Sequence, residues 1–221
     1  MNEPVDHPIE WHGVTLRLLA DRAVHHPAAD ALLVADLHLG KPASFRAGGV
    51  PVPEAVTGAD LERLSRLASR TGAGRIVVLG DLVHDAKALQ PRTLDQLHIW
   101  RSRHAHLEIG LVPGNHDRRA GDLAALGIEL LPARHHLAGL DLVHETAGTE
   151  SVPTLGGHVH PVLRLSARRG DRLRTPCFWF SGRVGILPAF GGFTGGRVMS
   201  NGPGDRIFAA GRDEVVPIPG A

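Results

Sequence analysis

The sequence predicts an α/β fold in one domain that spans residues 1–221. In the first half, apolar runs typical of buried strands alternate with segments of helical character. After Leu126 the pattern changes to short strands separated by Gly and Pro turns. Three strands of the first half end in similar polar stretches, and in open α/β sheets ligands bind beyond such strand ends. No linker-like composition and no internal repeat divides the chain.

The first half predicts four strands and two helices. The strands lie at residues 15–19, 31–36, 75–81 and 106–117, each marked by an apolar run. Leu61, Leu64 and Leu67 recur at helical spacing and predict a helix over 61–70 that ends at Thr71 and Gly72. A second helix is predicted within 86–104, beginning near Pro91. The Pro- and Gly-rich residues 40–60 predict a loop.

The second half predicts mostly β structure. Its short strands fall within residues 129–145, 154–167, 177–181 and 185–190. The only cysteine, Cys177, lies in one of these runs and is read as a buried strand residue. A single cysteine excludes an internal disulfide and a cysteine-built zinc site.

Composition narrows the location and the partners. No apolar run approaches the roughly 20 residues that a membrane-spanning helix needs. The N-terminus, MNEPVDHPIEWHG, is polar and acidic, unlike a signal peptide. We therefore expect a cytoplasmic protein with no membrane partner. The net charge of +1 provides no global field for nucleic acid, so any such binding must be local.

Five short segments place potential metal ligands at or near strand ends. They read Asp36-Leu37-His38, Gly80-Asp81, Gly114-Asn115-His116-Asp117, His144 and Gly157-His158-Val159-His160. Residues two apart on an extended chain point to the same side, so the first and last segments can each offer two groups to one cavity. One such pair could be a polar turn. Five ordered segments of ligand-type residues indicate a metal site.

These five motifs resemble those of the calcineurin-like metallophosphoesterases, and the resemblance spans most of the chain. It implies a four-layer αββα sandwich of two mixed β-sheets flanked by helices, with a two-metal site. The segments ADLHLGK, SFRAGGVPVPEAVT, GDLVH and LPAFGGFTGG also resemble one bacterial subgroup, the ligase-associated DNA damage response endonucleases. That subgroup neighbours a helicase, an exonuclease and a DNA ligase, which implies a functional association with these enzymes.

The resemblance implies two sets of metal ligands. One ion would be held by Asp36, His38, Asp81 and His160, and the other by Asp81, Asn115, His144 and His158, with Asp81 bridging. Nitrogen and oxygen ligands without thiolate suit Mn²⁺, Fe, Zn²⁺ or Ni²⁺, and we expect two Mn²⁺ ions. Two anionic ligands leave two divalent ions with a net charge of about +2, which attracts a phosphate ester.

Other residues are assigned to catalysis and substrate binding. In the family pattern His116 is not a ligand and can protonate the departing alkoxide. Asp117 would orient and charge its imidazole, or cap the segment that follows, or both. Arg46 and Arg118 are candidates for binding phosphate oxygens, because guanidinium matches phosphate bidentately. His84 is a candidate substrate contact, and a loop hydrogen bond is an equal alternative.

These features predict a dinuclear metal-dependent phosphodiesterase, a DNA endonuclease of the DNA damage response. The alternatives are a phosphodiesterase or phosphatase for a small nucleotide, a pyrophosphatase acting on a UDP-sugar-lipid of the lipid A precursor type, and a non-catalytic scaffold. A scaffold should have lost ligands, whereas all seven positions carry metal-binding side chains. An arginine-rich segment either guides a polyanionic strand or is simply solvated; it contains Arg164, Arg168, Arg169, Arg172 and Arg174.

Overall fold

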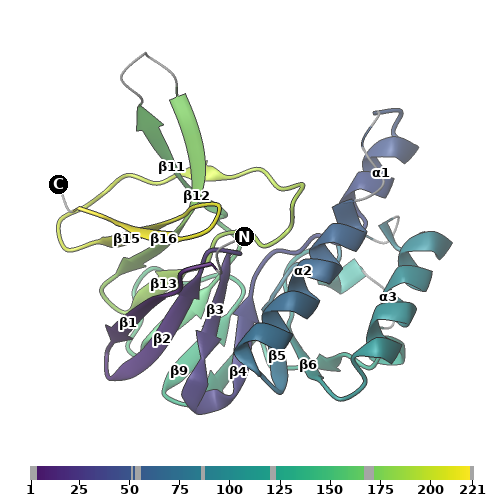
Figure 1. Cartoon of the computed structure of the whole chain (residues 1–221), viewed down its shortest axis with the longest axis horizontal. Coiled ribbons are helices and arrows are strands. Elements are labelled where there is room, and N and C mark those ends of the chain that lie inside the picture. Colours follow the sequence, from purple (N-terminus) through teal and green to yellow (C-terminus); the bar gives the residue numbers. More distant parts are fainter. Residues whose placement is uncertain are drawn as a thin grey trace.

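The computed structural model describes residues 4–50, 52, 56–85, 88–119, 123–166 and 172–219. These residues form two mixed β-sheets, with helices beside the first (Figure 1). The strands are β1 (His7–Trp11), β2 (Val14–Leu19), β3 (Ala23–His26), β4 (Ala31–Val34), β5 (Arg75–Leu79), β6 (Glu108–Val112), β7 (Glu129–Leu130), β8 (Arg134–Leu137), β9 (Leu140–Val143), β10 (Thr154–Gly156), β11 (Pro161–Ser166), β12 (Arg172–Ser181), β13 (Val184–Ile186), β14 (Arg197–Val198), β15 (Arg206–Ala210) and β16 (Val215–Ile218). The helices are α1 (Lys41–Ala47), α2 (Val56–Thr71) and α3 (Pro91–Arg103), with short 3₁₀ turns at Pro27–Ala29, Asp117–Arg119 and Ala124–Leu126.

The first sheet has seven strands in sequential order from β1 to β7. Strands β1 to β4 pair antiparallel, and β4 to β7 pair parallel. Val34 of β4 lies beside Val78 of β5, and Leu79 lies beside Val112 of β6. The carboxyl ends of these three central strands are therefore level with one another.

The second sheet has nine strands. Its main path runs β14-β11-β12-β13-β10-β9-β8, and β15 joins β12 to β16. Strands β9, β10 and β13 are mutually parallel, and the hairpin pairs of the sheet are antiparallel. Parallel strands again bring several carboxyl ends to one edge of the sheet.

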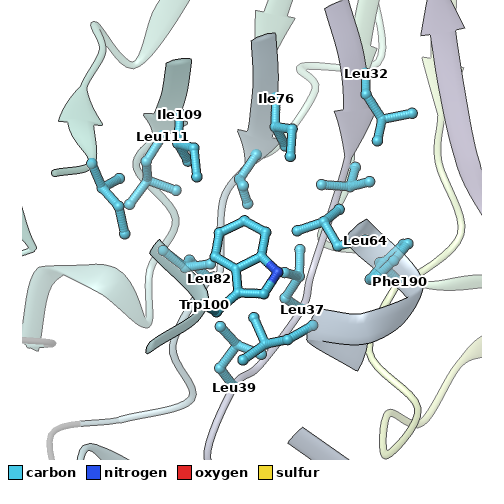
Figure 2. Close-up of a cluster of buried hydrophobic side chains, with 14 of the residues drawn as sticks. Leu32, Leu37, Leu39, Leu64, Ile76, Leu82, Trp100, Ile109, Leu111 and Phe190 are labelled. Atoms are coloured by element: carbon cyan, nitrogen blue, oxygen red, sulfur yellow. The ribbon is translucent and has the colours of Figure 1, made fainter. Parts of the chain in front are cut away.

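Two apolar clusters hold these layers together. Alternation along β5 sends Ile76 and Val78 into the cluster with α2 and α3, while Val77 and Leu79 enter the cluster between the sheets. Figure 2 shows Trp100 of α3 among leucines of the first cluster. The cluster between the sheets includes the aromatic rings of Phe178, Phe180 and Phe208.

The predicted fold class is confirmed as two mixed sheets with helices. In the residues that the structure describes, α2 and α3 pack on the first sheet, and a small cluster around Cys177 covers part of the second. Cys177 is fully buried, as predicted, and burial raises the pKa of its thiol to about 12. No helix of the described residues is long and apolar enough to cross a bilayer.

The prediction of a loop over residues 40–60 was wrong in two places. Lys41–Ala47 form α1, and α2 already includes residues from Val56 onward. Gly40 turns the chain at φ 76°, and Pro42 lies in the first helical turn, where a missing N–H leaves no hydrogen bond unmade. The prolines and glycines that predicted a loop thus include a helix start. Strands β1, β3, β14, β15 and β16 were also not predicted.

Trp100→Ala tests the apolar cluster between the first sheet and the helices α2 and α3. The side chain is 8% exposed, and its indole N–H donates to Ser65 Oγ at 2.9 Å. We expect the free energy of unfolding to fall by about 3–5 kcal/mol in urea titrations. The matched control is Ile99→Ala on the same helix, which is 53% exposed and should change stability by less than about 0.5 kcal/mol. Equal losses in the two variants would contradict this packing.

Candidate metal centre

Parallel strands of both sheets end next to the five motifs. In the first sheet, β4, β5 and β6 end at Val34, Leu79 and Val112, shortly before the first three motifs. In the second sheet, β9 ends directly before His144, and β10 ends directly before Gly157. Strand polarity therefore positions all five motifs at one edge of the sandwich.

Hydrogen bonds join the motif loops of the two sheets. The amide of Asp36 donates to the carbonyl of Gly80 at 3.1 Å, and the amide of His38 donates to the carbonyl of Asp81 at 2.8 Å. From the second sheet, the amide of His158 donates to Asp36 Oδ2 at 2.9 Å. The ligand loops thus hold one another in register.

The C-terminal segment LPAFGG supports the first motif. The amide of Phe190 donates to the carbonyl of Ala35 at 2.8 Å. The amide of Gly192 donates to both carboxylate oxygens of Asp60 on α2, at 3.0 and 3.1 Å, and Arg63 pairs with the same carboxylate at 3.0 Å. This segment therefore fastens the Asp36 loop to the helical layer.

Two motif glycines allow close packing against ligand residues. A Cβ at Gly80 would overlap the imidazole of His144, and a Cβ at Gly114 would overlap the carboxylate and amide of Asp81. Gly80 also has φ 77°. Any side chain at either position would displace a residue of the site.

Backbone strain is concentrated in the predicted ligands. Five of them adopt left-handed φ angles: Asp36 (54°), His38 (47°), Asp81 (52°), His158 (65°) and His160 (50°). Such conformations cost about 1–3 kcal/mol each in non-glycine residues and cluster at functional sites. The hydrogen bonds between the loops and the packed cores must offset that cost.

Asp36, His38 and His160 form one group that could hold a metal ion, which we call the His38 group. Their ligand atoms lie within 4.8 Å of one another. His160 Nε2 lies 3.3 Å from Asp36 Oδ1 and 3.4 Å from His38 Nε2. The Nδ1–H of His160 donates to the carbonyl of Gly195 at 3.2 Å, which turns Nε2 toward the group.

Asp81, His144 and His158 form a second group, which we call the His144 group. His144 Nε2 lies 3.5 Å from Asp81 Oδ1, 3.1 Å from His158 Nδ1 and 3.0 Å from Asn115 Oδ1. Its Nδ1–H donates to the carbonyl of Leu79 at 3.0 Å. An imidazole held this way by a backbone carbonyl is typical of a metal-binding histidine.

Asp81 lies between the two groups. Its Oδ1 faces His144, while its Oδ2 lies 3.8 Å from His38 Nε2. The carboxylate is 2% exposed as a residue, so its two oxygens are directed into the protein rather than to solvent. The structure thus brings all seven predicted ligands together around one carboxylate.

The residues fit divalent metal ions on their own chemistry. Asp36 Oδ1 is buried and has no hydrogen-bond partner among the described residues, a costly situation for a carboxylate oxygen. Its neighbours are imidazole nitrogens, which are borderline ligands that suit first-row divalent ions. A cation bound there would satisfy this oxygen.

The imidazole of His38 is kept neutral. Burial, together with the positive charge of Lys41, lowers the pKa of His38 to about 2. A neutral imidazole has the free lone pair that a metal ion requires. Lys41 was not predicted as a site residue, although it is the last residue of ADLHLGK and its charge also acts on Asp81 and His160.

His116 lies beside the His38 group and forms, with His38 and His84, a further set of ligand atoms within 4.8 Å of one another. Its Nδ1 hydrogen-bonds to the carbonyl of His84, and because a carbonyl only accepts, Nδ1 carries the proton. Its Nε2 lies 3.9 Å from Asp81 Oδ2, and the side chain is 34% exposed. The ring of His84 stacks on it, with centroids 5.0 Å apart at 22°, and His84 Nδ1 is 3.4 Å from His38 Nδ1.

Asp117 hydrogen-bonds to backbone amides and not to the His116 ring, which it was predicted to orient. Its Oδ2 accepts from the amides of Asp81 (2.7 Å) and Gly114 (2.9 Å), and its Oδ1 accepts from the amide of Val83 (3.2 Å). Burial raises the pKa of Asp117, and these amide hydrogen bonds oppose that rise. The carboxylate therefore binds the two motif loops together, while the carbonyl of His84 orients His116.

The two predicted phosphate-binding arginines have different surroundings. Arg118 is exposed and lines a cavity of about 360 Å³ together with Asn115 and His144. Arg46 instead donates to the carbonyl of Val52 at 3.0 Å and so holds its own loop. The structure thus brings Arg118, but not Arg46, to a cavity lined by predicted ligands.

The arginine-rich segment is described in part. Arg168 and Arg169 lie outside the described residues, as does the side chain of Arg172. Arg164 and Arg174 are exposed and lie directly opposite each other on β11 and β12.

Comparisons with known proteins identify the family. No family model matches the chain, and no curated protein matches it. Among solved structures, the nuclease MPE of Pseudomonas putida matches with a TM-score of 0.85 and 41% identity, over 97% of this chain and 100% of that one. YfcE, a phosphoesterase from E. coli, matches 81% of this chain and 86% of its own, with a TM-score of 0.43 and 16% identity. With 41% identity to nuclease MPE over 97% of its length and with the five motifs gathered at one edge, the chain belongs to the calcineurin-like metallophosphoesterases and is a metal-dependent phosphoesterase.

Proposed function

We propose that the protein is a dinuclear metal-dependent phosphodiesterase that cleaves DNA. The observation that carries this proposal is the convergence of the His38 group and the His144 group on Asp81. A carboxylate with one oxygen facing each group is suited to bridge two divalent ions. The similarity to a nuclease over nearly the whole chain supports a nucleic acid substrate.

In this proposal Asp36, His38, Asp81 and His160 hold one ion, and Asp81, Asn115, His144 and His158 hold the other. We propose Mn²⁺ for both positions, because carboxylate, amide and imidazole ligands suit it. Divalent ions bound there would supply Lewis acidity and an activated water for attack on phosphorus. The protein contributes the fixed ligand positions and the buried, neutral imidazole of His38.

His116 is proposed to donate a proton to the leaving oxygen. Its Nδ1–H is committed to the carbonyl of His84, so Nε2 is the nitrogen that can exchange a proton with substrate. That atom faces the site near Asp81 Oδ2 and is partly open to solvent. Asp117 acts as a positioning residue, because it ties the amides of both motif loops.

Cationic side chains would bind the phosphate oxygens. Arg118 lines the cavity beside Asn115, and among the described residues it forms no ion pair. Lys41 places a partly buried positive charge close to the His38 group. Arg46 and His84 remain proposed substrate contacts. For Arg46, the hydrogen bond to the carbonyl of Val52 in its own loop is a competing role.

Two cavities adjoin the site, which favours a strand over a compact substrate. One cavity adjoins Asn115 and His144, and another adjoins His160. A strand that continues beyond the scissile phosphate in both directions would occupy both. The role in the DNA damage response, the association with a helicase, an exonuclease and a DNA ligase, and the cytoplasmic location stay predictions of the sequence.

A substrate panel with Mn²⁺ tests the proposed function directly. It compares plasmid DNA, single-stranded DNA, cyclic nucleotides and a sugar–lipid pyrophosphate under one set of conditions. We expect turnover of DNA to exceed that of the others. Preferential hydrolysis of a cyclic nucleotide or of the pyrophosphate would mean that this molecule, and not DNA, is the substrate.

Asp81→Asn tests the bridge. A neutral amide cannot satisfy two divalent ions as a carboxylate does, so we expect metal occupancy and activity to fall together. Elemental analysis and hydrolysis of bis-nitrophenyl phosphate are measured on the same preparations. The matched control is Asp95→Asn on the exposed face of α3, which removes the same charge far from the motifs. An active Asp81→Asn protein with two tightly bound ions per chain would refute the bridging role.

His116→Ala separates proton donation from metal binding. A DNA alkoxide is strongly basic and needs a proton to leave, whereas nitrophenolate does not. We expect DNA hydrolysis to fall by about 10²- to 10⁴-fold. The loss on bis-nitrophenyl phosphate should be much smaller, with metal content near that of the wild type.

His158→Ala is the comparison variant for this experiment. It removes a proposed ligand, so it should depress both substrates alike and reduce bound metal. An equal loss on both substrates by His116→Ala, with metal content intact, would rule out the proton-donor role and point to phosphate binding instead.

A further inference from the structure

A second cavity adjoins the proposed metal centre on the side of His160. Its volume is about 270 Å³, and its lining includes His160, Arg22, Arg174 and Thr194. Neither arginine belongs to the five motifs. The cavity thus combines a residue of the His38 group with two cationic side chains from distant parts of the chain.

Arg22 forms a fixed wall of this cavity. Its guanidinium donates to the carbonyls of Ala189 and Gly191 at 3.2 and 3.3 Å. Burial lowers the pKa of Arg22 to about 10, and the side chain remains a cation at neutral pH. Two carbonyl contacts use only part of its five N–H donors, which leaves donors for an anion.

Arg174 is an exposed residue of the cavity lining. It hydrogen-bonds to the carbonyl of Gly196, which holds the side chain against the cavity. Arg164 lies directly across from it on β11, and like charges in such a pair destabilise a sheet. Among the described residues neither arginine forms an ion pair with a carboxylate. An anionic ligand would relieve this repulsion.

The hairpin of β11 and β12 is well placed for a long ligand. It projects from the second sheet beyond the body of the protein (Figure 1). Arg164 and Arg174 share one face of it, because directly opposed residues of an antiparallel pair point the same way. Leu165 and Leu173 share the other face. The positive face is thus distinct from an apolar one.

The geometry points to a binding site for a non-scissile phosphate of the DNA strand, formed by Arg22 and Arg174 beside His160 and extended along the hairpin by Arg164. This inference rests on the proposed function, since it assumes a substrate that continues past the scissile phosphate. Guanidinium forks suit phosphate oxygens, and a buried arginine loses little freedom on binding. A small nucleotide would leave this site empty.

The test is the salt dependence of DNA binding by the metal-loaded protein in the His116→Ala background. Each phosphate contact contributes about 0.7 to 0.9 to the magnitude of the log–log slope. We expect Arg174→Ala to lower the slope by about one such contact, and Arg164→Ala with Arg174→Ala to lower it further. Arg174→Lys keeps the charge and should keep the slope, which excludes misfolding as the cause.

Arg183→Ala is the matched control. Arg183 is exposed in the turn after β12, and the seven residue steps from Arg174 to the strand end at Ser181 alone span roughly 23 Å. Its loss should leave the slope unchanged. A slope unchanged in Arg174→Ala, or lowered as much by Arg183→Ala, would overturn the inference.

Kinetic measurements on variants that retain His116 separate this inference from the proposed function. Arg174→Ala should raise KM for DNA far more than it alters turnover of bis-nitrophenyl phosphate, which has no flanking phosphate. Equal losses on both substrates would indicate that Arg174 binds the scissile phosphate, and would overturn the inference. Failure of the unmodified protein to cleave DNA would contradict the proposed function itself, whatever the arginine variants do.

Discussion

Two buried carboxylates, Asp36 and Asp81, set the geometry on which the rest of the site depends. Asp36 accepts the amide of His158 from the second sheet, and Asp81 accepts the amide of His116 at 3.0 Å. Asp36 fixes a loop with Oδ2 while its Oδ1 faces His160, and Asp81 accepts the His116 amide with the same Oδ1 that faces His144, while its Oδ2 faces His38. The two sheets must pack in this register for the ligand groups to form, so the core between them is a condition for the chemistry.

This arrangement is costly without a bound cation. Burying unpaired carboxylates is unfavourable, and the left-handed backbone of five ligands adds strain. The apolar clusters on both sides of the first sheet must offset these costs. Because a cation that binds only the folded site stabilises the folded state, metal binding and folding should be coupled in this protein.

The sequence predicted the site better than it predicted the strands around it. The ligands were found because carboxylates and imidazoles at strand ends are unusual, and strand polarity alone brings them together. Strand β1 was missed because it is short, alternates exposed and buried residues, and depends on pairing with β2. The role of Asp117 could not be predicted from the sequence. Two of its amide partners, Asp81 and Val83, lie more than thirty residues away along the chain, and only Gly114 belongs to its own loop.

Local charge, rather than total charge, determines how this protein can meet a polyanion. With a net charge of +1, the chain has no overall field to attract DNA. Yet screening confines each charge to about 8–10 Å at physiological salt, so only cations near the bound strand contribute. Lys41 near the His38 group, Arg118 beside the His144 group and Arg174 beside His160 lie around the ligands. One acidic side chain, Glu145, shares the cavity of Arg118 and lies 3.8 Å from His158 Nε2, so the cations there act against a nearby negative charge. In the proposed function, these local cations would hold the phosphodiester strand although the net charge is near zero.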